Sequence, residues 1–216
     1  MNIKRLILEG ENVILDFKKT ISNCEKIAKT LVAFANNKGG KLLIGVADDG
    51  SIKGVKSEEE EKYMISKAAH QFCKPAIEPI FEEYIVDDKL ILVAEIPKSD
   101  TKPHYAADDQ GKWWVYFRIQ DKSVLASKIL IEVLKKDGDE EGTFIAYSDQ
   151  EKILLEYLGT NGRITLKEFS KLTRSAYKKA QKIIVNLILS GVILPHITEK
   201  EEYYIMADLK VESNRF

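Results

Sequence analysis

The chain has 216 residues, of which 44% are hydrophobic, and its formal net charge at pH 7 is -1. This length supports one sizeable hydrophobic core or two small ones, and the charge excludes an overall basic field, so any nucleic-acid contact must come from a local basic surface. No apolar run approaches the length of a membrane span, and Cys24 and Cys73 show no metal-ligand spacing. These features predict a cytoplasmic protein without a membrane partner.

A capped helix and a buried strand are predicted near the N-terminus. Ser22 and Glu25 have the spacing of a capping box, in which each side chain binds a free backbone N–H of the first helical turn. Apolar residues at helical intervals follow, and Gly39-Gly40 ends the helix because glycine takes the left-handed cap conformation without steric cost. Residues 41–46 are a short apolar run that predicts a strand, and residues 51–55 return as a hairpin.

Helices and strands continue to alternate after this hairpin. Residues 57–73 have a helical pattern, and residues 81–86 and 89–96 predict two strands joined by a tight turn. Residues 112–119 predict a strand rich in aromatic side chains, and a helix is expected from Ser123 to Leu134. This order predicts an α+β fold, with a mixed sheet and helices packed on one side of it.

A linker is predicted to separate two domains. The stretch from Lys135 to Gly142 has charged residues and two glycines but no apolar side chain, which is typical of a linker. We therefore expect a first domain at residues 1–135, a linker at 136–147 and a second domain at 148–216.

The second domain has the pattern of a winged helix-turn-helix. Capping-box spacings at Ser148 and Thr165 begin two helices, and a longer helix follows Arg174-Ser175. Residues 192–197 and 203–206 predict a two-stranded ribbon. Three helices followed by a ribbon are the element order of a winged helix, whose third helix enters the major groove of DNA.

The third helix of this domain is the clearest candidate for DNA contact. Residues 148–190 contain eight basic and four acidic residues, a net charge of +4 in a chain whose total is -1. The predicted ribbon is acidic, so it is a poor contact for phosphates. The residue types expected to bind phosphates and base edges are Arg174, Ser175, Tyr177, Lys178, Lys179, Gln181 and Lys182.

Several short motifs in the first domain resemble the Schlafen-type AlbA-like domain. They span roughly residues 5–135 and read Glu11 with Asp16-Phe17-Lys18, Ala33-Phe34-Ala35-Asn36, Gly39-Gly40, Ile44-Gly45-Val46, Asp49-Gly50, Lys102-Pro103-His104-Tyr105 and Tyr116-Phe117-Arg118-Ile119. The resemblance implies an AlbA-like fold in a family of binding modules and nucleases. His104, Tyr105 and Arg118 belong to these motifs, and we expect them to stack on or contact nucleic acid. Animal Schlafens form a horseshoe from two such lobes, which implies a homodimer for a chain with one lobe.

The same resemblance suggests an enzymatic alternative. Schlafen nucleases have two glutamates five residues apart and a third acid after a strand, and Glu11, Asp16 and Asp48 are nearest to this pattern, with Lys18 beside them. Clustered carboxylates hold Mg²⁺ or Mn²⁺, which activate water and neutralise a phosphodiester transition state. The same acids could instead cap turns or pair with Lys18 or Lys41.

Three functions follow from these patterns. The first is a DNA-binding transcriptional regulator that contacts duplex DNA and needs no cofactor. The second is a metal-dependent endoribonuclease that uses Glu11, Asp16 and Asp48 on RNA, and the third is a protein-interaction or oligomerisation module. ATP is not expected as a ligand, because the sequence around Gly39-Gly40 lacks the first glycine and the hydroxyl of a phosphate-binding loop.

Overall fold

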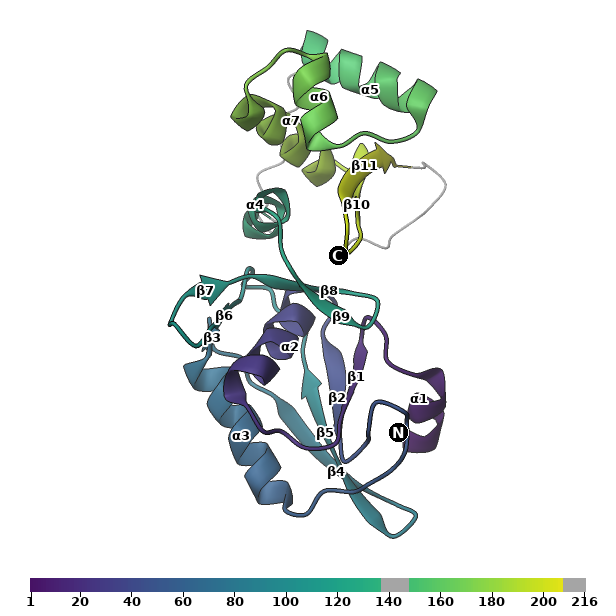
Figure 1. The fold of residues 1–216 in the computed structure, drawn as a ribbon, viewed down its shortest axis with the longest axis vertical. Coiled ribbons are helices and arrows are strands. Elements are labelled where there is room, and N and C mark those ends of the chain that lie inside the picture. The colour runs from purple at the N-terminus through teal and green to yellow at the C-terminus, as the bar shows by residue number, and fades with distance from the viewer. Residues whose placement is uncertain (137–147, 208–216) are drawn as a thin grey trace. The chain divides into compact units, whose positions relative to one another are not determined.

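The structure is a computed structural model that describes residues 1–136 and 148–207. The chain divides into two compact units, Met1–Ala126 and Ser127–Phe216 (Figure 1). The predicted linker lies outside the described residues except for Lys136. No helix of the described ranges is long and apolar enough to cross a membrane.

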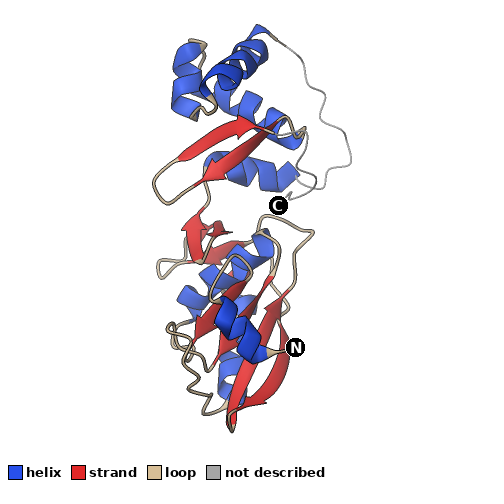
Figure 2. Ribbon diagram, turned by 90° about the vertical axis from the view of Figure 1, so that its right-hand side faces the viewer, coloured by secondary structure: helices blue, strands red, loops and turns tan. Residues whose placement is uncertain are grey.

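The first unit is built on a four-stranded mixed sheet. Its strand order is β1 (Leu15–Lys18), β2 (Gly40–Ile44), β5 (Lys89–Ile96) and β4 (Ile80–Val86). The β1–β2 pair is parallel and is connected by helix α2 (Cys24–Asn36), since a parallel pair needs a crossover connection. The other two pairs are antiparallel. The mixed sheet with its helices confirms the predicted α+β class (Figure 2).

Helices cover both faces of this sheet. On one face, α2 and α3 (Glu58–Gln71) contribute to a buried cluster that includes Leu31. On the other face, α1 (Ile3–Glu9) places Ile3 in a cluster with Phe17. The prediction of helices on one side only was wrong, because the N-terminal segment was not recognised as a helix.

The helix caps are close to those predicted. Ser148 and Thr165 cap two later helices as expected, and Ser57 caps α3. Helix α2, however, is capped by Asn23, whose Oδ1 accepts a hydrogen bond from the backbone N–H of Lys26 at 2.7 Å. Serine and asparagine are equally good caps, so the sequence pattern could not choose between two adjacent candidates.

Two smaller sheets complete the first unit. A three-stranded sheet contains β3 (Cys73–Lys74), β6 (Tyr105–Ala107) and β7 (Trp113–Trp114). A separate hairpin contains β8 (Tyr116–Ile119) and β9 (Lys122–Leu125).

The hairpin corrects one element of the prediction. Ser123 was expected to begin a helix, but it lies in β9 and pairs with Arg118 of β8. The turn between the two strands contains Gln120 with a φ of 52°. A glutamine is an uncommon residue in this left-handed conformation, which explains why the turn was not recognised from the sequence.

The second unit consists of helices followed by a two-stranded ribbon. Its elements are α4 (Lys128–Lys136), α5 (Asp149–Asn161), α6 (Leu166–Leu172), α7 (Tyr177–Leu189), β10 (Ile193–Ile197) and β11 (Glu202–Met206). The strands β10 and β11 are antiparallel, and Ile164 forms an isolated bridge to Tyr204 of β11. The side chains of both bridge residues are buried in the core of this unit.

Helix α4 belongs to the second unit, which moves the domain boundary. We predicted that this segment would close the first domain at residue 135. Instead, the chain divides after Ala126, and Ile129 and Val133 of α4 lie in the same buried cluster as Ile184 of α7. An amphipathic helix beside a linker can pack on either neighbouring domain, so its apolar periodicity did not determine which of the two domains contains it.

Candidate nucleic-acid interface

An exposed basic surface extends along helices α6 and α7. Within the described residues none of its side chains forms an ion pair, and Glu168 is the one acidic residue between positions 166 and 182. On α7, Lys178 and Lys182 lie four residues apart and therefore share one face, opposite the buried Ile184. We define the basic surface by its six exposed residues: Lys167, Lys171, Arg174, Lys178, Lys179 and Lys182.

The one acid in this region is occupied by helix capping. The carboxylate of Glu168 accepts hydrogen bonds from the backbone N–H and the hydroxyl of Thr165, at 2.8 and 2.9 Å. These bonds hold the pKa of Glu168 below its usual value. Its negative charge thus stabilises the N-terminus of α6, where the helix dipole favours an anion.

Three other predicted contact residues, in α7 or just before it, differ in exposure. Tyr177 is exposed, whereas Ser175 is half-buried with its hydroxyl 2.7 Å from that of Thr173. Gln181 is buried, and its amide donates to Oε1 of Glu132 in α4 at 2.7 Å. The prediction for Gln181 is corrected, since this side chain joins two helices of the second unit.

The ribbon adds little positive charge to the basic surface. Arg163 lies just before the bridge residue Ile164, but its Nη1 is 2.8 Å from Oε1 of Glu201 at the ribbon tip. Its guanidinium also lies 4.9 Å from the ring centroid of Tyr203. With its charge paired in this way, Arg163 is a weaker phosphate ligand than the unpaired lysines of α7.

In the first unit, Arg118 connects strand β8 to strand β1 from a buried position. It is 3% exposed and donates hydrogen bonds to the carbonyls of Asn12 and Leu15, at 3.2 and 3.1 Å. Its Nη2 lies 3.0 Å from Oδ1 of Asp16, and its guanidinium stacks 4.9 Å from the centroid of the Phe34 ring. The prediction that Arg118 contacts nucleic acid is therefore corrected, because every side of this group faces protein.

His104 is likewise a residue of the interior. It is 3% exposed, and its Nδ1 lies 2.9 Å from the carbonyl oxygen of Pro75. A carbonyl only accepts, so Nδ1 carries the proton and the neutral ring can accept from the Ser99 hydroxyl at Nε2, 2.7 Å away. Burial lowers the pKa of His104, which favours this neutral form. The contact predicted for His104 is also corrected, whereas Tyr105 beside it is partly exposed.

Glu11 lies close to Asp16 and Lys18 of β1, so two of the predicted acids and the lysine do come together. Oε1 of Glu11 accepts from the backbone N–H of Phe17 at 2.8 Å, and Nζ of Lys18 lies 3.1 Å from Oδ2 of Asp16 and 4.0 Å from Glu11. Burial, followed by the hydrogen bond to Asp16, raises the pKa of Glu11. Both carboxylates therefore have structural partners.

The third acid, Asp48, does not join this pair. Asp16 pairs with Leu42 in the parallel β1–β2 register, whereas Asp48 is in the exposed turn that follows the end of β2 at Ile44. Among the described residues no group of three or more histidine, cysteine or acidic side chains is placed to hold a metal ion. The predicted carboxylate triad of Glu11, Asp16 and Asp48 is therefore not formed.

The first unit matches a known family model. The model for the Schlafen AlbA_2 domain covers residues 11–127, which is more than half of the chain. The chain belongs to the Schlafen AlbA_2 family. This confirms the resemblance found in the sequence motifs, and membership of the family suggests nucleic-acid binding.

Two solved structures are similar to this chain. One is the N-terminal domain of a RecG-related protein from Nitrosomonas europaea, with 21% identity over 59% of this chain and 96% of that chain, and a TM-score of 0.44. The other is a protein from Corynebacterium diphtheriae, with 15% identity over 57% of this chain and a TM-score of 0.43. The match spans 24% of the C. diphtheriae chain, about a quarter of its length.

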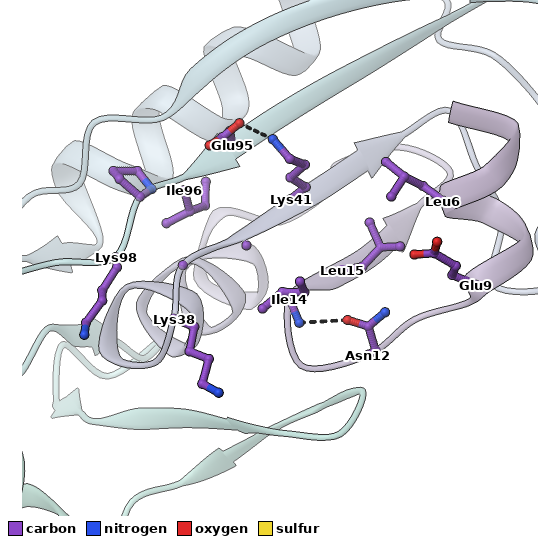
Figure 3. A pocket seen from close by; sticks show the side chains of 13 residues that line it. Leu6, Glu9, Asn12, Ile14, Leu15, Lys38, Lys41, Glu95, Ile96 and Lys98 are labelled. Carbon is purple, nitrogen blue, oxygen red and sulfur yellow. Dashed lines mark hydrogen bonds and ion pairs between the residues drawn. The ribbon is translucent and has the colours of Figure 1, made fainter. Parts of the chain in front are cut away.

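The double glycine of the Schlafen AlbA_2 domain has a packing role. Gly39 has a φ of 77°, and a Cβ atom there would lie 2.6 Å from the carbonyl oxygen of Ile96; a Cβ on Gly40 would lie 2.3 Å from the Phe34 ring. Both glycines border a pocket of about 270 Å³, where the side chains of Lys41 and Glu95 form an ion pair (Figure 3). Close packing against backbone at Gly39 and against an aromatic ring at Gly40 thus accounts for this motif.

The raised pKa of Glu11 makes stability depend on pH. The folded Schlafen AlbA_2 domain binds this proton more tightly than the unfolded chain, so stability falls as pH rises from the ordinary glutamate value of 4.5 through the folded value. Glu11→Gln keeps an oxygen acceptor for Phe17 but removes the titration. We expect the variant to gain stability relative to wild type as pH rises above 4.5, measured by urea unfolding. An equal gain in stability in Glu9→Gln, or no gain in Glu11→Gln, would show that Glu11 is not the source of this pH dependence.

Sequence reasoning missed two kinds of residue. Lys167 and Lys171 of α6 were counted in the charge of the second domain but were not named as contacts, although they extend the basic surface. Asn36 was noted only as part of a motif, yet its amide donates to the carbonyls of His104 and Tyr116, at 2.9 Å each. The spacing of charged side chains on two successive helices could have identified the lysines.

Proposed function

We propose that this protein binds duplex DNA through the basic surface of α6 and α7 and acts as a transcriptional regulator. The observation that carries the proposal is the set of six exposed basic side chains, none of which forms an ion pair within residues 1–136 and 148–207. Unpaired cations release condensed counterions when they meet phosphates, and this release supplies most of the affinity for DNA. The family relationship of the first unit supports the same class of ligand.

The order of elements in the second unit supports a helix-turn-helix mode of binding. Helix α6 ends at Leu172, a short turn follows, and α7 begins at Tyr177. In such an arrangement the second of the two helices lies in the major groove and its first turns read base edges. Tyr177 and Lys178 occupy those first turns and are exposed, so they are the residues proposed to contact bases and phosphates.

The ribonuclease hypothesis has weaker support. Glu11 and Asp16 lie together, but each carboxylate is held by a neighbouring backbone or side-chain donor, and Asp48 is in a separate turn. The homodimer and the interaction-module hypotheses stay predictions without a specific contact to support them.

A salt titration of the intact chain tests the proposal. The chain is mixed with a fluorescently labelled 20-base-pair duplex, and the dissociation constant is measured by anisotropy at several salt concentrations. If four to six of the basic side chains neutralise phosphates, the logarithm of affinity should fall with the logarithm of salt concentration with a slope of about -4 to -5. A slope near zero, or no binding at low salt, would contradict the proposal.

A further inference from the structure

One face of the small sheet β3–β6–β7 carries two aromatic rings and a lysine. Residues paired across antiparallel strands point to the same face, and neighbours along a strand point to opposite faces. Lys74 pairs with Tyr105, and Ala107 pairs with Trp113. Tyr105 and Ala107 are two apart on β6, so all four residues lie on one face, which we call the aromatic face. Figure 1 shows the three strands side by side.

The two rings and the lysine of the aromatic face reach solvent, whereas its fourth residue, Ala107, is 7% exposed. The opposite face carries Cys73 and Ala106, both of which are buried in the main core of the first unit. On the aromatic face, Lys74 is exposed, Trp113 is 43% exposed and Tyr105 is partly exposed. Neither Tyr105 nor Trp113 belongs to a hydrophobic core cluster of the described residues, so both rings are available to a ligand.

The charge of the aromatic face is positive. Its one ionisable group besides the tyrosine is Lys74, which forms no hydrogen bond or ion pair with any of the described residues through its side chain. Tyr105 and Trp113 are diagonal neighbours on adjacent strands, with backbone positions roughly 7–8 Å apart. Two rings at this separation with a cation beside them match the combination of bases and phosphates in a nucleic-acid strand.

Trp114 is 40% exposed, about as much as Trp113, but its side chain is hydrogen-bonded to the protein. Its indole N–H donates to Oδ2 of Asp108 at 2.8 Å, and Oδ1 of Asp108 accepts from the backbone of Gln110 and Lys112. By strand alternation Trp114 points to the face opposite Trp113. The two neighbouring tryptophans therefore have different roles, one in fixing the β6–β7 turn and one on the aromatic face.

We infer that the aromatic face binds single-stranded nucleic acid, with unpaired bases stacked on Trp113 and Tyr105 and a phosphate near Lys74. This rests on the proposed function in so far as the chain is a nucleic-acid-binding protein. Bases in a duplex are already stacked on one another, so only a strand with unpaired bases can place its rings on those of the protein. The ligand class differs from the duplex assigned to the basic surface.

The test uses the intact chain, a labelled single-stranded oligothymidine and the labelled duplex. Trp113→Ala is expected to weaken binding of the single strand by roughly 5- to 150-fold, the range for loss of one stacked base, and to leave duplex binding unchanged. Trp113→Phe, which keeps an aromatic ring, should retain most of the affinity. Thermal unfolding of each variant verifies that the fold is intact.

A second measurement observes the stacking itself. The chain has two tryptophans, so Trp113 is the sole indole in Trp114→Phe. Its emission should be quenched when the single strand is added, because a stacked base is in contact with the ring. Charge reversal of Lys74 to glutamate should reduce this quenching at a given concentration of oligonucleotide.

The outcomes separate this inference from the proposed function. Loss of single-strand binding in Trp113→Ala with intact duplex binding supports the aromatic face. Unchanged single-strand binding in that variant, or a wild-type chain that binds the duplex but not the single strand, overturns the inference and leaves the proposed function standing. A wild-type chain that binds neither nucleic acid overturns both.

Discussion

Replacement of Arg118 by methionine is expected to destabilise the Schlafen AlbA_2 domain by about 3–5 kcal/mol, the range for breaking a buried ion pair from one side. The substitution leaves Lys18 as the one remaining cation beside buried Asp16 among the described residues, and it removes the donors to Oδ1 of Asp16 and to the carbonyls of Asn12 and Leu15. Methionine fills part of the same volume, so the loss reflects the unpaired polar groups more than a cavity.

Urea unfolding followed by tryptophan emission measures this effect within one unit. Both tryptophans of the chain are in the first unit, so their emission reports on the Schlafen AlbA_2 domain. Arg5→Met is the matched control, because Arg5 is exposed and pairs with Glu9 on the helix surface, where such pairs contribute below about 1 kcal/mol. Similar losses in the free energy of unfolding in the two variants would show that the buried contacts of Arg118 do not stabilise the domain as described.

Charge reversal of Lys178 and Lys182 to glutamate is expected to weaken duplex DNA binding on the order of 10- to 100-fold at 0.1 M salt. Each lysine that contacts a phosphate contributes about one to the salt slope, so the double variant should also lower the slope by about two. Both side chains are exposed on one face of α7 and lie away from its core contacts, so the fold should persist.

The matched control is charge reversal of Lys53 and Lys56. These lysines are also exposed and unpaired among the described residues, and the change in net charge is the same, but they lie in the first unit outside the basic surface. An equal loss of affinity in both double variants would indicate a general effect of charge. An unchanged affinity in Lys178→Glu/Lys182→Glu would remove α7 from the interface.

The parts of the fold that depend on local pattern could be predicted from the sequence. Apolar periodicity and capping residues located α2, α3, α5, α6 and α7 because these signals lie within one or two turns of the helix itself. The division after Ala126 could not be predicted in the same way. It depends on which core receives Ile129 and Val133 of α4, and that choice is made by tertiary packing.

In the candidate site, too, local pattern could be predicted from the sequence and tertiary contacts could not. Exposed lysines on α7 were identified because surface position follows from helical phase alone. Arg118 and His104 were misassigned because their partners are distant in sequence: Asp16 is 102 residues from Arg118, and Asn36 is 68 residues from His104. A polar residue in a motif can equally hold the fold together or meet a ligand, and only its burial and partners distinguish the two.

Lysine footprinting of the DNA complex tests the central claim most directly. The intact chain is treated with a limiting amount of an acetylating reagent, with and without saturating duplex, and modification at each lysine is quantified by mass spectrometry. The account predicts that Lys178, Lys179 and Lys182 are protected by DNA, while Lys53 and Lys56 are modified to the same extent in both samples. Protection of Lys53 and Lys56, with the lysines of α7 modified equally in the two samples, would contradict it.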